Sequence, residues 1–289
     1  MRKIIENENL KVEFNLLGGS LTSIYSKENK EEYLYQIEEN SWQGQDVAIF
    51  PFVARLKDKT YTYEGNTYFL RNHGLCRYYT FDVIKEAKDE ATILFKSSEE
   101  TLKEYPFNFH FYITYKVINK TLSITYEVIN DGEKVMPFGI GAHPAFKLIP
   151  EGDNTTGNYV ELSEEQELTR ICFDEKGEMV IGEENYGKKK DIEVDKELFR
   201  KYQTLCVKGQ NLNDVVIKRK DGKYLKFHYD NINYLVLWSF PNSGNYVALE
   251  PWMSLPDYID ADKDILKKKT LIHLKGKEKY IFHYQIEIN

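Results

Sequence analysis

The segment Phe109–Asp131, FHFYITYKVINKTLSITYEVIND, is the clearest indication of the fold. Apolar and polar side chains alternate on both sides of Asn119-Lys120, which is the pattern of β-strands that each bury one face. A helix would instead repeat its apolar residues every three or four positions. The segment therefore predicts an antiparallel pair of strands joined near Asn119-Lys120.

Similar signals recur along the rest of the chain. Residues 61–70, YTYEGNTYFL, predict a hairpin that turns at Glu64-Gly65-Asn66. Residues 215–229 predict another hairpin, with Asp221-Gly222 as a type I′ turn. Further strands are predicted at residues 232–240, 245–252 and 280–288.

Helical patterns are scarce, with short candidates at Ser97–Lys103, Glu164–Glu167 and Lys196–Phe199. Many short strands with regular turn signals favour an all-β fold, a large antiparallel β-sandwich or a barrel. Neither an internal repeat nor a linker is apparent, so we expect one domain over residues 1–289. The polar segment Glu151–Lys190 is expected to form loops that decorate the sandwich.

Bulk composition limits the partners. The formal net charge of −7 argues against binding to nucleic acid or anionic membranes, since both need a basic field. The lysines at 188–190 lie among acidic residues and are expected to be solvated surface. No signal peptide or membrane-length apolar run is evident, so we expect a cytoplasmic protein. Tyr and Phe are abundant, at 22 and 16 residues, and such rings favour strands and can pack on sugars.

The cysteines and histidines give no metal motif. Cys76, Cys172 and Cys206 are far apart and lack a CxxC pair, so neither a disulfide framework nor a zinc site is expected. Nucleophile-elbow, Walker A, HExxH and dinucleotide-binding patterns are absent from the sequence. Four histidines lie in alternating segments and are expected to be sheet residues: His110, His228, His273 and His283.

Three segments combine polar residues with turn-forming residues beside strong strands, where functional residues tend to lie. The first contains Arg55, Asn72, His73 and Arg77, the second contains His143 before Pro144, and the third contains Glu250 before Pro251-Trp252.

Each of these residues also has a structural interpretation. His73 could be a turn histidine, and His143 could have a structural role. A buried Glu250 must be paired or hydrogen-bonded, and Arg55 could be its partner. Two histidines and a glutamate could also ligate zinc, but their spacing gives no specific metal signal, and we expect no metal.

The motifs, in their order, resemble those of the aldose 1-epimerase (mutarotase) family, most closely its LacX-like branch. They are Arg55 with His73-Gly74, then His143-Pro144-Ala145-Phe146-Lys147-Leu148, then Glu250-Pro251-Trp252. The resemblance spans nearly the whole chain. It implies a galactose mutarotase-like β-supersandwich and a cofactor-independent isomerase.

The resemblance also implies roles for particular residues. Glu250 matches the catalytic base, His143 the catalytic acid, His73 a second active-site histidine and Arg55 a substrate-positioning arginine. Asp214 is the candidate for an aspartate that binds sugar hydroxyls. Asn72, Arg77, Phe146 and Trp252 complete the expected substrate-binding set. Galactose mutarotases have Phe-Asn-Leu where this chain has Phe-Lys-Leu at 146–148, so the identity of the sugar stays open.

Mutarotation needs one base and one acid on opposite sides of the anomeric centre, and neither a metal nor a redox cofactor. The expected partner is a small sugar, with Trp252, Phe146 and Trp238 as candidates for an aromatic wall. Two alternatives remain. One is a hexose-6-phosphate epimerase that binds phosphate through the cations Arg77, Lys57 and Arg71, and the other is a non-catalytic carbohydrate-binding or sensing protein. The oligomeric state stays open.

Overall fold

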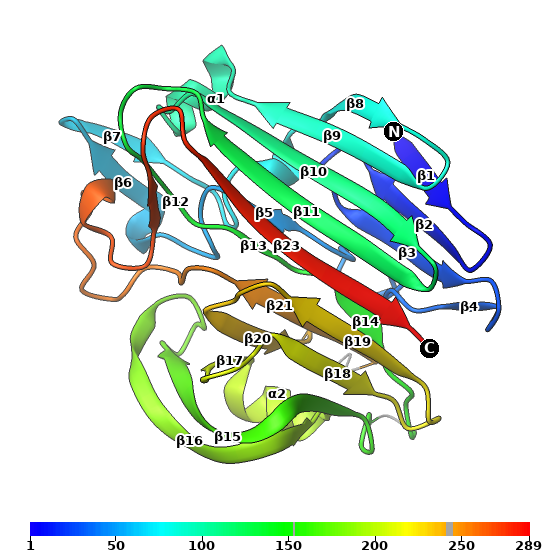
Figure 1. Ribbon diagram of the computed structural model, residues 1–289. Helices are drawn as coiled ribbons and strands as arrows, with labels where there is room; N and C mark the ends of the chain where they lie inside the picture. Colours follow the sequence, from blue (N-terminus) through cyan, green and yellow to red (C-terminus); the bar gives the residue numbers. More distant parts are fainter. Residues whose placement is uncertain (153, 241–244) are drawn as a thin grey trace.

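Antiparallel β-strands make up most of the structure, a computed structural model that describes residues 1–152, 154–240 and 245–289 (Figure 1). The all-β prediction is therefore confirmed. The N-terminal strands form a sheet of their own, in the order β1 (Arg2–Glu6), β2 (Leu10–Asn15), β3 (Leu21–Ser26) and β4 (Glu31–Glu32).

Within the described residues, the main sheet has fifteen strands. Its spatial order begins with β5 (Ala48–Ile49), β13 (Gly141–Ala142), β21 (Tyr246–Trp252), β20 (Tyr234–Trp238), β17 (Thr204–Lys208) and β15 (Tyr159–Phe173). It continues with β18 (Asp214–Lys218), β19 (Tyr224–Tyr229), β23 (Lys279–Ile288), β11 (Thr121–Asn130), β10 (Phe109–Ile118), β9 (Glu90–Lys96) and β8 (Asp82–Glu86). Beside this path, β14 (Ala145–Lys147) pairs with β21, and β16 (Val180–Glu193) pairs with β15.

The remaining elements are short. They are β6 (Thr60–Tyr63) paired with β7 (Asn66–Phe69), β12 (Met136–Phe138) paired with β22 (Ile272–Leu274), helices α1 (Glu99–Glu104) and α2 (Lys196–Tyr202), and 3₁₀ segments η1 (Lys57–Lys59), η2 (Cys76–Tyr78) and η3 (Ile265–Lys267). Ser98 and Asp195 cap the two helices by accepting hydrogen bonds from the backbone N–H groups of Thr101 and Leu198. Two of the three predicted helices are thus confirmed.

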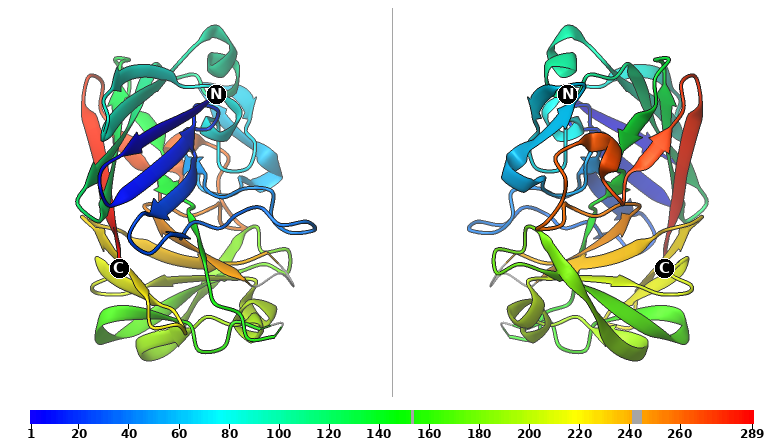
Figure 2. Two further views of the ribbon diagram at one scale, coloured as in Figure 1. Left: turned by 90° about the vertical axis from the view of Figure 1, so that its right-hand side faces the viewer. Right: turned by 90° about the vertical axis from the view of Figure 1, so that its left-hand side faces the viewer.

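The two larger sheets pack face to face, and Figure 2 shows β1–β4 lying against the strands around β10 and β11. Alternation along β10 buries Phe109, Phe111, Ile113 and Tyr115, as the sequence predicts. Across the interface the rings of Phe14 and Tyr115 have centroids 4.8 Å apart. Each fully buried side chain of this size stabilises the fold by about 1.5–3 kcal/mol, so this core fixes the scaffold that carries the site.

The predicted hairpins form, with one difference in turn geometry. Asn119-Lys120 joins β10 to β11, and β6 pairs with β7 around Glu64-Gly65. Between β18 and β19, however, the N–H of Gly222 donates to the carbonyl of Arg219 at 3.0 Å, and Gly222 has φ of 87°. This three-residue loop ends in a left-handed glycine and is not the type I′ turn predicted at Asp221-Gly222. The four histidines expected in strands do lie there, in β10, β19, β22 and β23.

The segment Glu151–Lys190 was predicted as loops, and that prediction is wrong. Most of it lies in the long antiparallel strands β15 and β16. The helix predicted at Glu164–Glu167 lies inside β15, next to an irregularity in the strand register. Most of β16 is exposed or half-buried, so polar residues occupy both of its faces and hide the period of two. Strand pairing here overrides the helical propensity of glutamate.

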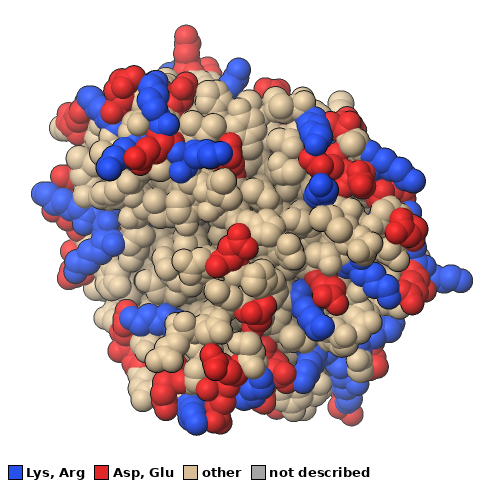
Figure 3. All heavy atoms as spheres, in the orientation of Figure 1, with Lys and Arg blue, Asp and Glu red and all other residues tan. Residues whose placement is uncertain are grey.

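Charges of both signs are interspersed on the surface, and Lys188 is exposed as expected. On the face shown in Figure 3, acidic and basic side chains gather toward the periphery, while the centre is mostly uncharged. Among the described residues, every helix is too short or too polar to span a bilayer.

Candidate active site

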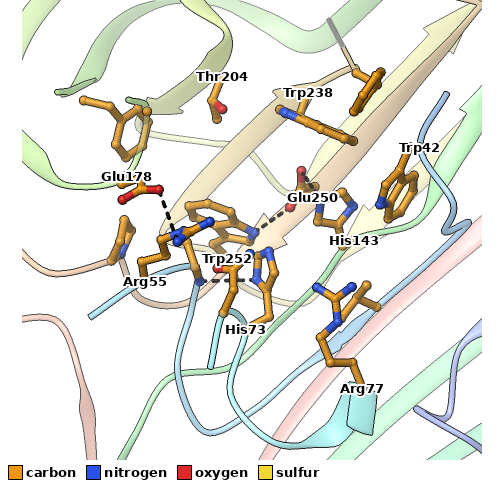
Figure 4. A pocket seen from close by; sticks show the side chains of 17 residues that line it. Trp42, Arg55, His73, Arg77, His143, Glu178, Thr204, Trp238, Glu250 and Trp252 are labelled. Atoms are coloured by element: carbon orange, nitrogen blue, oxygen red, sulfur yellow. Dashed lines mark hydrogen bonds and ion pairs between the residues drawn. The ribbon is translucent and has the colours of Figure 1, made fainter. Parts of the chain in front are cut away.

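A pocket of about 260 Å³ opens beside β21 and is lined from several parts of the chain that are distant in sequence (Figure 4). Seven of the residues singled out in the sequence line it: Arg55, Asn72, His73, Arg77, His143, Glu250 and Trp252. Trp238, expected as an aromatic wall, lines it as well. The structure therefore brings together most of the predicted site.

Strand β21 places Glu250 in this pocket by simple alternation. Val247 and Leu249 face the main core, whereas Ala248 and Trp252 belong to smaller clusters on the opposite face. Glu250 shares that second face and is only 1% exposed. The indole N–H of Trp252 donates to Oε2 of Glu250 at 3.0 Å. Residues two apart on a strand point the same way, so β21 supplies both the carboxyl group of Glu250 and its hydrogen-bond donor, Trp252.

His143 and Glu250 form a buried pair, with Nε2 of the imidazole 3.2 Å from Oε1 of the carboxyl group. Burial raises the pKa of Glu250 well above its usual value, although the Trp252 N–H counteracts part of this rise. Burial also lowers the pKa of His143 to about 3. The closed, solvent-poor site therefore favours the uncharged form of each group.

His73 adopts a left-handed backbone conformation, with φ of 60°. Its backbone N–H donates to the carbonyl of Ala54 at 2.9 Å, and the N–H of Ala54 donates back to Nδ1 of His73 at 3.2 Å. Burial, together with the nearby charges of His143, Arg77 and Arg55, lowers the pKa of His73 well below its usual value. With Nδ1 accepting, the neutral ring carries its proton on Nε2, so His73 is set up as a hydrogen-bond donor.

The tight turn around His73 depends on the next residue. Gly74 has φ of 76°, and a Cβ at this position would lie 2.4 Å from the carbonyl oxygen of Phe50. Only glycine fits so close to the backbone at Phe50. The His73-Gly74 pair seen in the sequence is therefore both a turn and a site element, and the two interpretations do not compete.

Asp46 holds the backbone beneath the site and was not predicted. Its Oδ2 accepts from the N–H of Leu21 at 3.0 Å, and its Oδ1 lies 3.4 Å from the N–H of His143. Burial raises the pKa of Asp46 to about 6. The side chain is 4% exposed and ties the segment that carries His143 to the start of β3.

Arg55 does not pair with Glu250, contrary to the structural alternative raised from the sequence. Its Nη1 lies 3.2 Å from Oε1 of Glu178, a residue of the turn between β15 and β16. The partner of Glu250 is His143. A sequence alone could not place Glu178 here, because the turn lies in the segment whose strands were not recognised.

Two more of the predicted residues have polar groups in the pocket that lack a hydrogen-bond or ion-pair partner. Oδ1 of Asn72 is buried and has no hydrogen-bond partner among the described residues. Arg77 lines the pocket and forms no ion pair with the described carboxylates. Arg71, by contrast, pairs with Glu104 outside the pocket, and Lys57 does not line it.

Aromatic rings surround His143. Trp42 and Trp238 have centroids 4.8 and 5.3 Å from the imidazole, and Trp238 meets it edge-on. Trp42 was not predicted, although a tryptophan in the polar sequence SWQGQD is an unusual signal that points to a binding role. These rings give the pocket an apolar wall next to its polar groups.

Phe146 and Asp214 lie outside the pocket, contrary to expectation. Phe146 pairs with Val247 across β14 and β21, and its ring packs on Phe227 in the main core. Asp214 lies at the exposed start of β18, where it accepts from Nδ1 of His228 at 2.8 Å. Strand alternation turns Phe146 to the core face, and the strand that carries Asp214 does not reach the pocket.

The site also lacks the pattern of a metal centre. Among the described residues, no three His, Cys, Asp or Glu side chains are grouped so that they could hold a metal ion. The side chains that converge in the pocket are instead a contacting histidine–glutamate pair with a neighbouring indole hydrogen-bond donor.

Comparisons with known proteins agree with this geometry. Residues 2–286 match the model of the aldose 1-epimerase family. Protein LacX of Lactococcus lactis subsp. lactis, in plasmid and chromosomal forms, is 30% identical over 278 residues, covering 93% of this chain and 92% of LacX.

Solved structures show the same fold. A galactose mutarotase related enzyme from Lactobacillus acidophilus is 29% identical with a TM-score of 0.92, over 100% of this chain and 97% of that one. A galactose mutarotase-like protein from Lactobacillus casei is 22% identical with a TM-score of 0.94, over the full length of both chains. The predicted galactose mutarotase-like fold is confirmed, and the chain belongs to the aldose 1-epimerase family.

Proposed function

We propose that this protein interconverts the α and β anomers of an aldose, with His143 and Glu250 as the proton-transferring pair. The observation that carries the proposal is that both side chains are buried in one pocket, with the imidazole and the carboxyl group 3.2 Å apart. At that distance the two groups act from one side of the anomeric centre, whereas the sequence led us to expect them on opposite sides. The pocket volume of about 260 Å³ is below the ~300–1,000 Å³ typical of sites for drug-sized ligands and suits a single sugar ring.

The chemistry requires two proton transfers that balance. Glu250 removes the proton of the anomeric O1–H, the C1=O1 bond forms, and the C1–O5 bond breaks as O5 takes a proton from His143. Rotation about C1–C2 then presents the other carbonyl face, and the same groups act in reverse to close the ring. The pair holds one dissociable proton throughout, so neither a redox cofactor, a metal nor a covalent intermediate enters the proposal.

Burial sets the proton distribution of the pair. It raises the pKa of Glu250 and lowers that of His143, so the uncharged distribution, with Glu250 protonated and His143 neutral, is favoured. Ring opening therefore starts from the minor, charged distribution and ends in the favoured one, and ring closure runs in the reverse direction.

The other pocket residues position the sugar in this proposal. His73 donates from Nε2, and Asn72 offers an unpaired buried Oδ1 as an acceptor. Trp42 and Trp238 provide ring faces on which the apolar side of a pyranose can pack.

The test is anomer exchange measured by NMR across a panel of aldoses and their 6-phosphates. We expect exchange well above the spontaneous rate for at least one sugar, unaffected by chelators. Binding of a sugar without accelerated exchange would instead favour a non-catalytic carbohydrate-binding or sensing protein.

A hexose 6-phosphate is the second candidate substrate, and Arg77 is the observation that favours it. This arginine lines the pocket without an ion-pair partner among the described carboxylates. A guanidinium suits phosphate because its donors match two oxygens at once. Under this alternative, the phosphates in the panel would exchange at least tenfold faster than the free hexoses, and Arg77→Ala would abolish the preference.

A further inference from the structure

Five polar side chains form a chain of contacts on the outer face of the main sheet. Oγ of Ser123 lies 3.0 Å from Nε2 of His283, and Nδ1 of His283 lies 3.0 Å from Oδ1 of Asp230. The same Asp230 oxygen lies 3.9 Å from Nε2 of His228, whose Nδ1 contacts Asp214 at 2.8 Å. None of these residues belongs to the described lining of the pocket, so the epimerase chemistry does not account for them.

Neighbouring strands bring the first three of these residues together. Ser123 lies on β11, His283 lies on β23, and Asp230 directly follows β19, and these strands are adjacent in the sheet (Figure 1). Alternation turns Ser123 outward, since Leu122 and Ile124 on either side of it are buried in the core. The fold thus places on one open surface a serine and a histidine that are 160 positions apart in the sequence.

The carboxylate of Asp230 selects the tautomer of a neutral His283. A carboxylate only accepts hydrogen bonds, so Nδ1 of His283 carries the proton and donates to Oδ1 of Asp230. Nε2 is then unprotonated, and the hydroxyl of Ser123 donates to it. The backbone N–H of Asp230 also donates to the carbonyl of His283 at 3.1 Å, which holds the two residues together. In this arrangement an imidazole can take the proton of a serine hydroxyl.

The strand register surrounds Ser123 with hydrogen-bond donors. Gln285 on β23 and Lys116 on β10 lie directly opposite Ser123, one on each side of it. Directly opposed residues of antiparallel strands share a face and have Cβ atoms about 4.5–5.5 Å apart. A side-chain amide and an ammonium group are therefore within reach of an oxygen that gains negative charge next to Ser123.

Stability does not account for this arrangement. The side chain of Asp230 is 58% exposed and that of His283 is 20% exposed, and ion pairs this open to solvent add little to folding. A hydroxyl, an imidazole and a carboxylate aligned in this order are what a nucleophilic serine needs, whatever fold carries them.

We propose that Ser123 is a nucleophilic serine that hydrolyses small acyl esters, with His283 as its general base and Asp230 as the residue that orients the imidazole. Oγ forms a bond to the ester carbonyl carbon while its proton passes to Nε2 of His283. The tetrahedral oxyanion then collapses, the bond to the alcohol oxygen breaks, and His283 gives its proton to that oxygen. Water attacks the acyl-serine with the help of the same base, which releases the carboxylic acid and restores Ser123.

The position of Ser123 limits the substrates. The serine lies on a strand face at the surface, so the favoured esters have a small acyl group and a leaving group that departs readily. This activity is independent of the proposed function, because the two sites share no residue.

The experiment measures hydrolysis of p-nitrophenyl acetate by wild type, Ser123→Ala, His283→Gln and Asp230→Asn. We expect wild type to release p-nitrophenolate above the spontaneous rate, and each variant to lose about a hundredfold or fall to the spontaneous rate. The double variant Ser123→Ala/His283→Gln should be no worse than either single one, because the residues act as a unit. Mass spectrometry of wild type quenched during the reaction should find an acetyl group on the peptide that contains Ser123.

His110→Gln is the matched control, since it removes another outward-facing histidine, on β10, that has no serine partner among the described residues. It should leave ester hydrolysis unchanged. Circular dichroism melts check that the variants fold, and anomer exchange measured on the same proteins should not respond to Ser123→Ala. A wild type that reacts only at the spontaneous rate would overturn the inference. So would a folded Ser123→Ala protein with the wild-type rate, or an acetyl group found only on other residues.

Discussion

The indole Nε1 of Trp252 lies 3.0 Å from Oε2 of Glu250, two residues earlier on β21. Trp252 was expected to contact the sugar, and the structure also makes it a hydrogen-bond donor to Glu250. This N–H lowers the pKa of Glu250 against the larger effect of burial. The Glu-Pro-Trp motif is therefore an acid with its own hydrogen-bond partner, aligned by strand alternation.

Trp252→Phe should accordingly shift the alkaline limb of the pH–rate profile to higher pH. Without the N–H donor, burial acts unopposed and the pKa of Glu250 rises further. We also expect kcat/KM to fall about tenfold, because one oxygen of the base loses its orienting hydrogen bond. Steady-state anomer exchange from pH 4 to 10 measures both effects.

Trp238→Phe is the control for this variant, because it also removes an indole from the pocket. It should change KM without moving the alkaline limb. A Trp252→Phe profile that overlays that of wild type would contradict the assignment of Trp252 as a partner of the base.

Glu250→Gln and His143→Gln should each lose ~10²–10⁴-fold in rate while the fold is kept, since neither amide transfers a proton at neutral pH. The double variant should be little worse than either single one, because the groups act as a unit on one shared proton. Exchange rates for the three variants, with circular dichroism melts as a check on folding, provide the measurement. A stable Glu250→Gln protein that exchanges anomers at nearly the wild-type rate would remove Glu250 from the mechanism.

The sequence predicted most of the fold because most strands bury one face and expose the other. Phe109–Ile118 reads as a strand from its alternation alone, and the structure agrees. The β15–β16 hairpin was missed because much of it is exposed and its register is irregular, so no apolar period marks it. Alternation of apolar and polar residues reveals a strand only where one face of the strand is buried and the other is exposed.

That His143 and Glu250 line one pocket could be predicted, because the motifs around them resemble those of the family. Asp46 and Glu178 were not predictable, since their roles depend on contacts with Leu21 and Arg55 that are distant in sequence. Phe146 was misplaced because its position in a motif does not reveal which face of β14 it occupies. The positions of these three residues depend on tertiary contacts, or on which face of a strand a side chain occupies, and the residue type alone reveals neither.

Asp46 makes a testable contribution to stability as a function of pH. Burial raises its pKa to about 6 in the folded state, from 3.8 as the usual value. A raised folded-state pKa favours folding below pH 3.8, and this contribution is lost as the pH rises through 6. The difference amounts to about 3 kcal/mol, at about 1.4 kcal/mol per pKa unit.

Asp46→Asn removes this titration. Wild type loses stability between pH 4 and 7 and the variant does not, so the free energy of unfolding of the variant should increase relative to that of wild type over this range. The absolute change at low pH should be unfavourable, because an amide has one acceptor oxygen for the N–H groups of Leu21 and His143. Urea unfolding at four or five pH values measures the trend. A stability difference that stays constant with pH would contradict a raised Asp46 pKa.

The pH dependence of kcat/KM tests the central pair directly. Its active form carries one proton, so activity should fall when a second proton binds and when the shared one is lost. Burial lowers the pKa of His143 to about 3, so the acid limb should lie near pH 3 or at the onset of acid unfolding. Burial raises the pKa of Glu250, so the alkaline limb should lie well above 4.5. The result is a broad bell whose limbs belong to the coupled pair.

If His143 titrated at the usual histidine pKa of 6.5, the acid limb of kcat/KM would lie near pH 6.5 and not near pH 3. We therefore expect the acid limb to lie below pH 5, and a small inflection near 6, where the ionisation of Asp46 raises the pKa of Glu250. Spontaneous mutarotation is itself catalysed by acid and base, so the rate without enzyme must be subtracted at each pH. Asp46→Asn should remove the inflection and leave the outer limbs in place. An acid limb centred near 6.5 that survives in Asp46→Asn would show that His143 titrates as a solvated imidazole, and the buried-pair mechanism would then be wrong.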